Sequence, residues 1–182
     1  MKHHKILFSG PVGAGKTTAI ASISDHAPVL TEAKARDSTR LIKERTTVAM
    51  DYGVMELEGG EKVHLYGTPG QPRFDFMWDI LAEGGLGIVL LIDNSAADAM
   101  HRLDQFLRVF DEVIERTSLV VGVTKMDVSA TLTLADYVDR LDAAGVRAPV
   151  LEVDARERRD VALLVEALLY SIDPGLSMDD VA

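Results

Sequence analysis

The sequence contains no cysteine. Disulfides, thiolate nucleophiles and cysteine-ligated metal sites are therefore excluded within this chain. Basic residues are also scarce: 19 Lys and Arg stand against 29 Asp and Glu, which leaves a net charge of −10. Nucleic-acid backbones and anionic membranes are bound by clustered Lys and Arg, so this balance argues against both kinds of partner.

Long hydrophobic runs are missing too, because no apolar stretch approaches the roughly 18 residues that a membrane-spanning helix needs. No secretory signal pattern precedes the first apolar run, and the chain offers no cysteine for prenylation. Lys2 stands where N-myristoylation requires glycine. We therefore expect a cytoplasmic protein with neither membrane insertion nor a lipid anchor.

The composition is that of an ordinary globular domain, with 47% hydrophobic and 26% charged residues. A chain of 182 residues is long enough to bury one full core. One domain over residues 1–172 is predicted, followed by an acidic, loosely ordered tail over residues 173–182.

Short apolar runs alternate along the chain with longer amphipathic patterns. Apolar runs without polar alternation suit parallel strands that are covered on both faces, and stripes of period 3.6 predict helices. Strands are predicted at residues 5–8, 47–57, 63–66, 87–92, 119–123 and 150–153, with a hairpin turn at Gly59-Gly60. Helices are predicted from the end of the first loop to about residue 25, and at residues 73–82, 103–114, 136–145 and 161–172. The alternation predicts an α/β fold: a mainly parallel six-stranded sheet with one antiparallel edge strand and helices on both faces.

The most specific motif is Gly10-Pro11-Val12-Gly13-Ala14-Gly15-Lys16-Thr17, which matches GxxxxGK(S/T) and follows the apolar run at residues 5–8. Such a loop lies between a buried strand and a helix, and its backbone N–H groups surround a polyphosphate at the positive helix end. Lys16 would add a charge at the outer phosphates, and Thr17 would offer its hydroxyl to Mg²⁺. The motif predicts a single P-loop NTPase domain and leaves the base of the nucleotide open.

Two segments at the ends of predicted strands could recognise the base of the nucleotide. Thr124-Lys125-Met126-Asp127 directly follows the strand at 119–123, at the carboxyl end where open α/β sheets bind ligands. The Asp127 carboxylate could accept hydrogen bonds from both N1–H and the exocyclic amine of guanine, a donor pair that adenine lacks. Lys125 could lie along the base plane. Asp154-Ala155-Arg156 follows the last strand, where a backbone N–H could meet the guanine carbonyl oxygen, although an ordinary strand-to-helix turn would look the same.

Two further segments could respond to the γ-phosphate. In Gly67-Thr68-Pro69-Gly70-Gln71, a glycine N–H could contact that phosphate and the glutamine could orient a water, whereas a plain Gly/Pro turn is the alternative. The charged segment at residues 30–46 is either an exposed linker or a loop that orders around a ligand.

These motifs, in this order, resemble those of the Ras-like small GTPases over residues 5–172. The segments Thr46–Asp51 and Gly67–Gln71 are similar to the prokaryotic branch that includes MglA and the GTPases of conservon operons. The resemblance implies GTP/GDP and Mg²⁺ as ligands, with residues 30–47 as switch I and residues 67–81 as switch II. The nucleotide-binding residues that it implies are Gly10, Val12, Gly13, Ala14, Gly15, Lys16, Thr17, Thr18, Thr47, Gly70, Thr124, Lys125, Asp127, Ala155 and Arg156.

The resemblance also assigns roles in catalysis and metal binding. Thr17 and Thr47 are the implied Mg²⁺ ligands, and Gln71 is the residue that would orient the attacking water. Lys16 would stabilise phosphate charge. Arg45 could swing toward the phosphates from switch I, although a solvated charge is an equal alternative; Arg36, Arg40 and Arg73 are the other candidates.

The chain departs from the Ras-like pattern at three positions. Gly67 stands where most of these proteins have an Asp that holds a Mg²⁺-bound water, so this contact must be lost or supplied elsewhere. Val12 replaces a usual glycine and would crowd Gln71 and any entering arginine, which predicts slow intrinsic hydrolysis. Thr124 replaces a usual Asn and offers fewer hydrogen bonds, so we expect a weaker tie between the base loop and the phosphate loop.

The predicted function is a guanine-nucleotide switch that hydrolyses GTP slowly and signals through its two switch segments to protein partners. The alternatives are a scaffold that binds GTP or GDP without hydrolysis, and a P-loop metabolite kinase or ATPase. The resemblance implies roadblock-type partners, and we expect a monomer or weak dimer.

Overall fold

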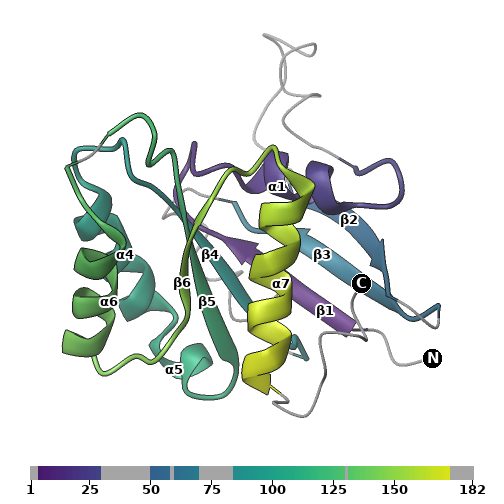
Figure 1. Cartoon of the computed structure of the whole chain (residues 1–182). Coiled ribbons are helices and arrows are strands. Elements are labelled where there is room, and N and C mark those ends of the chain that lie inside the picture. The colour runs from purple at the N-terminus through teal and green to yellow at the C-terminus, as the bar shows by residue number, and fades with distance from the viewer. Residues whose placement is uncertain (1–3, 30–49, 58–59, 70–83, 130, 173–182) are drawn as a thin grey trace, which may run out of the picture.

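The structure is a computed structural model that describes residues 4–29, 50–57, 60–69, 84–129 and 131–172. Within these residues, six strands form one sheet in the order β2-β3-β1-β4-β5-β6 (Figure 1). β2 is antiparallel to β3, and the other neighbouring pairs are parallel. The strands are β1 (His4–Ser9), β2 (Asp51–Glu56), β3 (Lys62–Gly67), β4 (Gly87–Asp93), β5 (Ser118–Thr124) and β6 (Val150–Val153). The predicted fold class is thereby confirmed.

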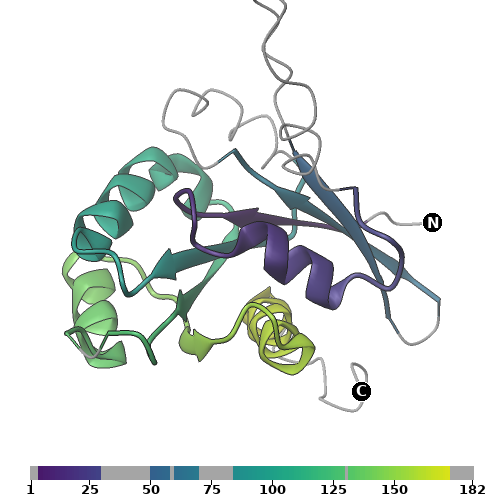
Figure 2. The ribbon, with the colours of Figure 1, turned by 90° about the horizontal axis from the view of Figure 1, so that it is seen from above.

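Helices cover both faces of the sheet (Figures 1 and 2). One face carries α1 (Lys16–Ile23) and α7 (Arg158–Ile172), which also contact each other. The other face carries α4 (Ala99–Val109), α5 (Asp111–Ile114) and α6 (Leu134–Ala143).

Side chains on the two faces of the central strands pack into two separate hydrophobic clusters. In β1, Ile6 and Phe8 pack on the side of α1 and α7, whereas Leu7 packs on the side of α4. Every residue of β4 is buried, which explains why its sequence lacks polar alternation. Each fully buried aliphatic side chain contributes roughly 1.5–3 kcal/mol to folding. These clusters fix the strands and therefore fix the loops that follow them.

The predicted helix at residues 103–114 is wrong as a single helix. Phe110 interrupts the helix: α4 ends before it and the short α5 begins after it. Phe110 and Val113 both remain in the buried cluster. The apolar stripe that suggested one helix therefore reflects burial of both segments.

The other described elements match their predictions closely. α6 begins with a capping box between Thr133 and Asp136, and Gly145 follows its end with a positive φ of 74°. The hairpin turn between β2 and β3 includes Gly60, with φ 80°. The predicted helix at 73–82, residues 47–49 of the second predicted strand and the tail at 173–182 lie outside the described residues.

The parallel strands all end at one edge of the sheet. The pairs Phe8↔Gly67, Asp93↔Thr124 and Thr124↔Val153 lie side by side there. This edge brings together the loops after β1, β5 and β6, which carry the predicted nucleotide motifs. No helix in the described part of the chain has the length and apolar character to span a bilayer.

Candidate nucleotide-binding site

The phosphate loop connects the end of β1 to the start of α1. Its backbone requires glycine at Gly10, where φ is 140° and an added Cβ would lie 2.2 Å from the carbonyl oxygen of Leu91. Gly15 caps α1 in the left-handed region, with φ 100°. The first turn of α1 contains no acidic side chain. The partial positive charge at this helix end is therefore not neutralised within that turn and can attract a phosphate.

Lys16 lies folded back along this loop. Its Nζ donates to the carbonyl oxygens of Gly10 and Pro11 at 2.7 and 2.8 Å, and the residue is 9% exposed. These bonds hold the loop closed around a concave row of backbone groups. They also place the ammonium charge at the rim where a polyphosphate would lie.

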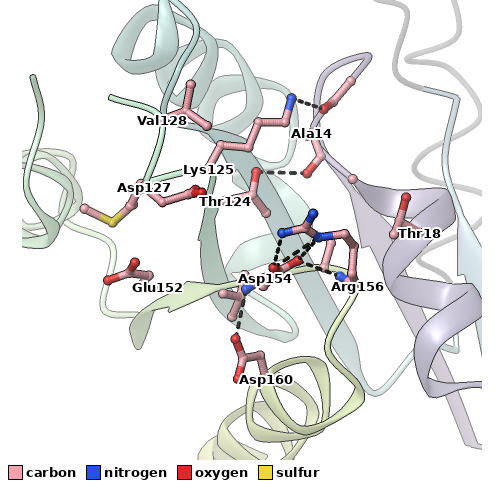
Figure 3. A pocket seen from close by; sticks show the side chains of 15 residues that line it. Ala14, Thr18, Thr124, Lys125, Asp127, Val128, Glu152, Asp154, Arg156 and Asp160 are labelled. Atoms are coloured by element: carbon pink, nitrogen blue, oxygen red, sulfur yellow. Dashed lines mark hydrogen bonds and ion pairs between the residues drawn. The ribbon is translucent and has the colours of Figure 1, made fainter. Parts of the chain in front are cut away.

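A cavity of about 760 Å³ opens beside the phosphate loop (Figure 3). It is bounded by three loops, those after β1, β5 and β6. The lining residues are Gly13, Ala14, Gly15, Thr18, Thr124, Lys125, Met126, Asp127, Val128, Glu152, Val153, Asp154, Ala155, Arg156 and Asp160. The structure thus brings the predicted base-reading residues and part of the phosphate loop into one hollow of a size common for small-molecule sites.

Thr124 and Lys125 join the base loop to the phosphate loop. The Thr124 hydroxyl lies 3.1 Å from the carbonyl oxygen of Ala14 and 3.2 Å from that of Ile92, and it donates to these groups. Lys125 Nζ donates to the Gly13 carbonyl oxygen at 3.2 Å (Figure 3). The Thr124 hydroxyl therefore still reaches the phosphate loop, and the expectation that this tie is weaker than the one made by Asn stays a prediction.

Lys125 is held in an unusual conformation by its partners. Its φ of 59° is uncommon for a residue other than glycine, and such positions cluster at functional sites. Its ammonium also contacts Asp93 Oδ2 at 2.5 Å. Burial raises the pKa of Asp93, but the hydrogen bonds from Lys125 and Ser95 outweigh it and hold this pKa below its ordinary value. The charged pair therefore fixes the Lys125 stem along one wall of the cavity.

Asp127 and the loop after β6 complete the cavity. Asp127 is exposed and borders the hollow, whereas Ala155 is buried and packs against the phosphate loop at Gly15. Arg156 pairs with Asp154 of its own loop, with Nη2 and Oδ2 2.5 Å apart (Figure 3). This side-chain hydrogen bond lowers the pKa of Asp154 to about 2. The pairing leaves the backbone of Ala155, more than the guanidinium of Arg156, as the group available to a base.

Two buried residues that the sequence analysis missed support the base loop. The Asn94 amide group donates to the Ser129 carbonyl oxygen at 2.7 Å, and its backbone N–H donates to Thr124 at 2.9 Å. The Tyr137 hydroxyl donates to Asn94 Oδ1 at 2.8 Å, and burial raises the pKa of Tyr137 to about 12. The one indication in the sequence was a polar Asp93-Asn94 pair directly after a buried strand.

The metal side of the site contains Thr17 and an acid from the antiparallel strand. Thr17 Oγ1 donates to Asp51 Oδ2 at 2.5 Å. A hydroxyl and a carboxylate suit Mg²⁺, which prefers oxygen ligands and is commonly bound by one or two carboxylates together with phosphates and water. In the described ranges no cluster of three or more His, Cys, Asp or Glu residues could hold a metal by itself. The residues thus fit an ion that arrives with a nucleotide.

Four of the predicted site residues cannot be placed. Thr47, Gly70, Gln71 and Arg45 lie outside the described residues, as do all of predicted switch I and residues 70–81 of predicted switch II. Their roles stay predictions.

Comparison with known proteins identifies the family. The chain matches the family model described as "Conserved hypothetical ATP binding protein" over residues 29–173. The chain belongs to this family. The match begins after the phosphate loop and includes the base loop at Thr124–Asp127.

Individual relatives point to Ras-like small GTPases. The chain is 30% identical over 111 residues to the Ras-related protein Rab-10 of Diplobatis ommata. The match covers 59% of this chain and 50% of Rab-10. It is 24% identical over 161 residues to the GTP-binding protein ypt1 of Schizosaccharomyces pombe, covering 86% of the chain and 73% of ypt1. The chain spans about half the length of several curated relatives that it matches, Rab-10 among them.

A solved structure shows the same fold. The Arl6 BBS3 small GTPase from Trypanosoma brucei, with the bound nucleotide analogue GppNp, superposes with a TM-score of 0.70 at 15% identity. The match covers 96% of this chain and 100% of that one. At 15% identity this match shows the fold alone. The similarity to the Rab and Ypt relatives supports the resemblance to the Ras-like small GTPases, while the likeness to the prokaryotic branch stays a prediction.

Proposed function

We propose that this protein is a guanine-nucleotide-binding molecular switch that binds Mg²⁺·GTP and hydrolyses it slowly to GDP and phosphate. The observation that carries the proposal is the single cavity shared by the phosphate loop and the Thr124–Asp127 segment. Thr124 and Lys125 bond directly to the carbonyls of Ala14 and Gly13. A ligand that fills this hollow meets a base-reading carboxylate and a phosphate cradle held at a fixed distance from each other.

The choice of base rests on Asp127. The family description names ATP, whereas ypt1 is named a GTP-binding protein. A carboxylate at the cavity rim pairs with the two N–H donors of guanine, and adenine would leave it without donors at that edge. We therefore favour guanine over adenine as the base that this protein binds.

Hydrolysis would use groups from the phosphate loop and the switch segments. Lys16 and the N-terminus of α1 would stabilise charge on the outer phosphates. When bound, Mg²⁺ would neutralise phosphate charge beside Thr17. Gln71 would orient the attacking water, and Arg45 is the candidate arginine in cis. Unchanged single-turnover hydrolysis in Arg45→Ala would reject that role for Arg45.

The switch proposal assigns residues 30–47 and 67–81 to segments that order around the γ-phosphate and relax after hydrolysis. Described residues next to them support this placement. Buried Thr68 follows β3 and bonds to Ser9 at the end of β1, with 3.0 Å between their hydroxyl oxygens. The start of switch II is thus tied to the strand that leads into the phosphate loop.

A scaffold that binds nucleotide without hydrolysis is the second candidate. Val12 supports it, because this side chain is 58% exposed on the phosphate loop, where a β-branched group would crowd an attacking water or an entering arginine. A P-loop ATPase or metabolite kinase is the third, and the family description is its main support.

Nucleotide analysis of the purified protein tests all three. We expect GDP or GTP in the protein and displacement of labelled GDP by GTP but not by ATP. Displacement by ATP at similar concentrations would reject the guanine-specific switch. Phosphate release from GTP then separates the slow switch from the scaffold.

The remaining elements of the proposal concern context. We propose a cytoplasmic location, protein partners that include roadblock-type regulators, and a monomeric or weakly dimeric state. Size-exclusion chromatography with light scattering, run with GDP and with a GTP analogue, tests the oligomeric state.

A further inference from the structure

Gly67 raises a question about the magnesium site, because a Ras-like protein would carry an acid at this position. The glycine is buried at the end of β3, next to the phosphate loop. In the β2–β3 pair, Gly67 is the direct partner of Asp51. The residue opposite the missing acid is therefore itself an acid.

The Asp51 side chain occupies the space over Gly67. A Cβ added at Gly67 would lie 3.1 Å from the Cβ of Asp51 and 3.4 Å from its Oδ2, with the end of the Ile20 side chain 3.0 Å away. An Asp at position 67 and an Asp at position 51 would thus compete for the same volume. The glycine and the acid opposite it form a complementary pair.

The Asp51 carboxylate points at the residue predicted to bind the metal. Thr17 Oγ1 donates its proton to Asp51 Oδ2 at 2.5 Å. A hydroxyl has one proton to donate and two lone pairs, so this bond directs the remaining lone pairs away from Asp51. A Thr17 hydroxyl held in this way is oriented to act as an oxygen ligand.

We propose that Asp51, from β2, is the acid of the magnesium site: it positions the Thr17 hydroxyl and supplies the negative charge that Gly67 lacks. The proposal rests on the proposed nucleotide function. Asp51 is 8% exposed, and a carboxylate withdrawn from water in this way is favoured where a cation offsets its charge. Compared with the Ras-like pattern, the acid lies on β2 instead of β3, at the position paired with Gly67, and it contacts Thr17.

The competing role for Asp51 is purely structural, as a link between α1 and β2. The substitution Asp51→Asn separates the two roles, because an amide oxygen still accepts from Thr17 while the negative charge is lost. A structural link would survive this change, whereas an acid of the metal site would not.

The test measures how Mg²⁺ slows the release of fluorescently labelled GDP from the full chain. In Asp51→Asn we expect the Mg²⁺ concentration for the half-maximal effect to rise by about 10–100-fold, the loss typical of groups that orient metal ligands. With excess EDTA, the mutant and the unmodified protein should release GDP at the same rate. The matched control is Glu56→Gln, which removes an exposed carboxylate from the other end of β2 and should leave the midpoint unchanged.

An unchanged Mg²⁺ midpoint in Asp51→Asn would overturn the inference. A protein that binds no guanine nucleotide, with or without Mg²⁺, would instead overturn the proposed function. Tight GDP binding that Mg²⁺ does not affect would leave the nucleotide site standing and reject only the role of Asp51.

A relocation experiment tests the equivalence of the two positions. The double variant Asp51→Gly, Gly67→Asp returns the acid to β3 and removes the Asp51 atoms that lie nearest to its new side chain, so that only the flexible end of Ile20 must shift. We expect its Mg²⁺ midpoint to move back toward that of the unmodified protein, while Asp51→Gly alone stays defective. A folded double variant with the midpoint of Asp51→Gly would contradict the claim that the acid was moved between strands.

Discussion

The two ends of the candidate site are constructed in different ways. At the base end, Thr124 and Lys125 tie the loop after β5 to the phosphate loop, and Asp154 holds Arg156 within the loop after β6. At the metal end, the contact between Thr17 and Asp51 joins a helix to an antiparallel edge strand. The base end can be recognised from consecutive residues, whereas the metal end depends on which strands pair.

This difference bears on which properties of the site can change independently. The proposed base recognition is concentrated in the loop after β5, whose supports, Asn94 and Tyr137, are buried behind it. The metal end carries the departures at Val12 and Gly67 from the Ras-like pattern. We therefore expect substitutions at the base end to change affinity and specificity, and those at the metal end to change Mg²⁺ dependence and hydrolysis.

The largest expected effect is a change of base specificity at Asp127. Asp127→Asn should lower GDP affinity on the order of 10³-fold, less than the roughly 10⁴–10⁵-fold of fully buried recognition sites because Asp127 is exposed. Xanthosine diphosphate should bind better to the variant, since an amide can donate to the additional carbonyl oxygen. Competition binding with both nucleotides measures the change, and retained guanine affinity would show that the base is recognised elsewhere.

The second-largest effect is expected for Asn94, which supports the base loop from behind. Asn94→Ala removes the partner of Tyr137 and the bond to Ser129, so it should cost about 1–3 kcal/mol in the free energy of unfolding. GDP affinity should fall with it, because the backbone after Thr124 loses its anchor. Urea denaturation and GDP titration measure the two effects. Tyr137→Phe is the milder comparison, because it keeps the packed ring and removes only the hydroxyl that donates to Asn94. No effect of Tyr137→Phe would mean that Tyr137 acts by packing alone.

At the metal end, Val12→Gly should raise GTP hydrolysis by about tenfold, or about 1.4 kcal/mol in the activation barrier. The reason is relief of crowding around the attacking water, and GDP affinity should hardly change. Val138→Ala, at a partly exposed valine on α6, is the control. Single-turnover phosphate release gives the rates. An unmodified protein that turns over well above about 10⁻² per second would already contradict slow intrinsic hydrolysis.

The same contrast explains how far the sequence could be interpreted. The strands were predictable because β1 and β4 each contain an uninterrupted apolar run, and the phosphate loop because its glycines stand at fixed spacing. The helix break at Phe110 was not predictable, since apolar residues continue through it without Gly or Pro. Asp51 and Asn94 were missed because their roles arise from contacts with residues 34 and 43 positions away, in Thr17 and Tyr137.

A smaller effect is expected for the bond between the two loops. Thr124→Val keeps the side-chain shape and removes the hydroxyl, which should cost about 1 kcal/mol of GDP binding, or about fivefold in affinity. The loss arises because the carbonyl of Ala14 forfeits its donor and the base loop can shift from the phosphate loop. GDP dissociation rates measure this. Equal rates for the two proteins would show that Lys125 alone is sufficient to hold the loops together.

The smallest expected effect is the acid response of the loop after β6. Hydrogen bonds from Arg156 lower the pKa of Asp154 from 3.8 to about 2, so the pair stabilises the fold above pH 4. This contribution is lost as the pH falls from about 4 to about 2 and the folded-state carboxylate becomes protonated. Asp154→Asn should therefore lower Tm slightly at pH 7, and the difference should vanish once the pH falls below the folded-state pKa of about 2. Both side chains reach solvent, so high salt should shrink the difference at pH 7 as well. A difference that keeps its full size below pH 2 would mean that Asp154 orders the loop through its backbone contacts, and that charge plays no part in holding this wall of the base end.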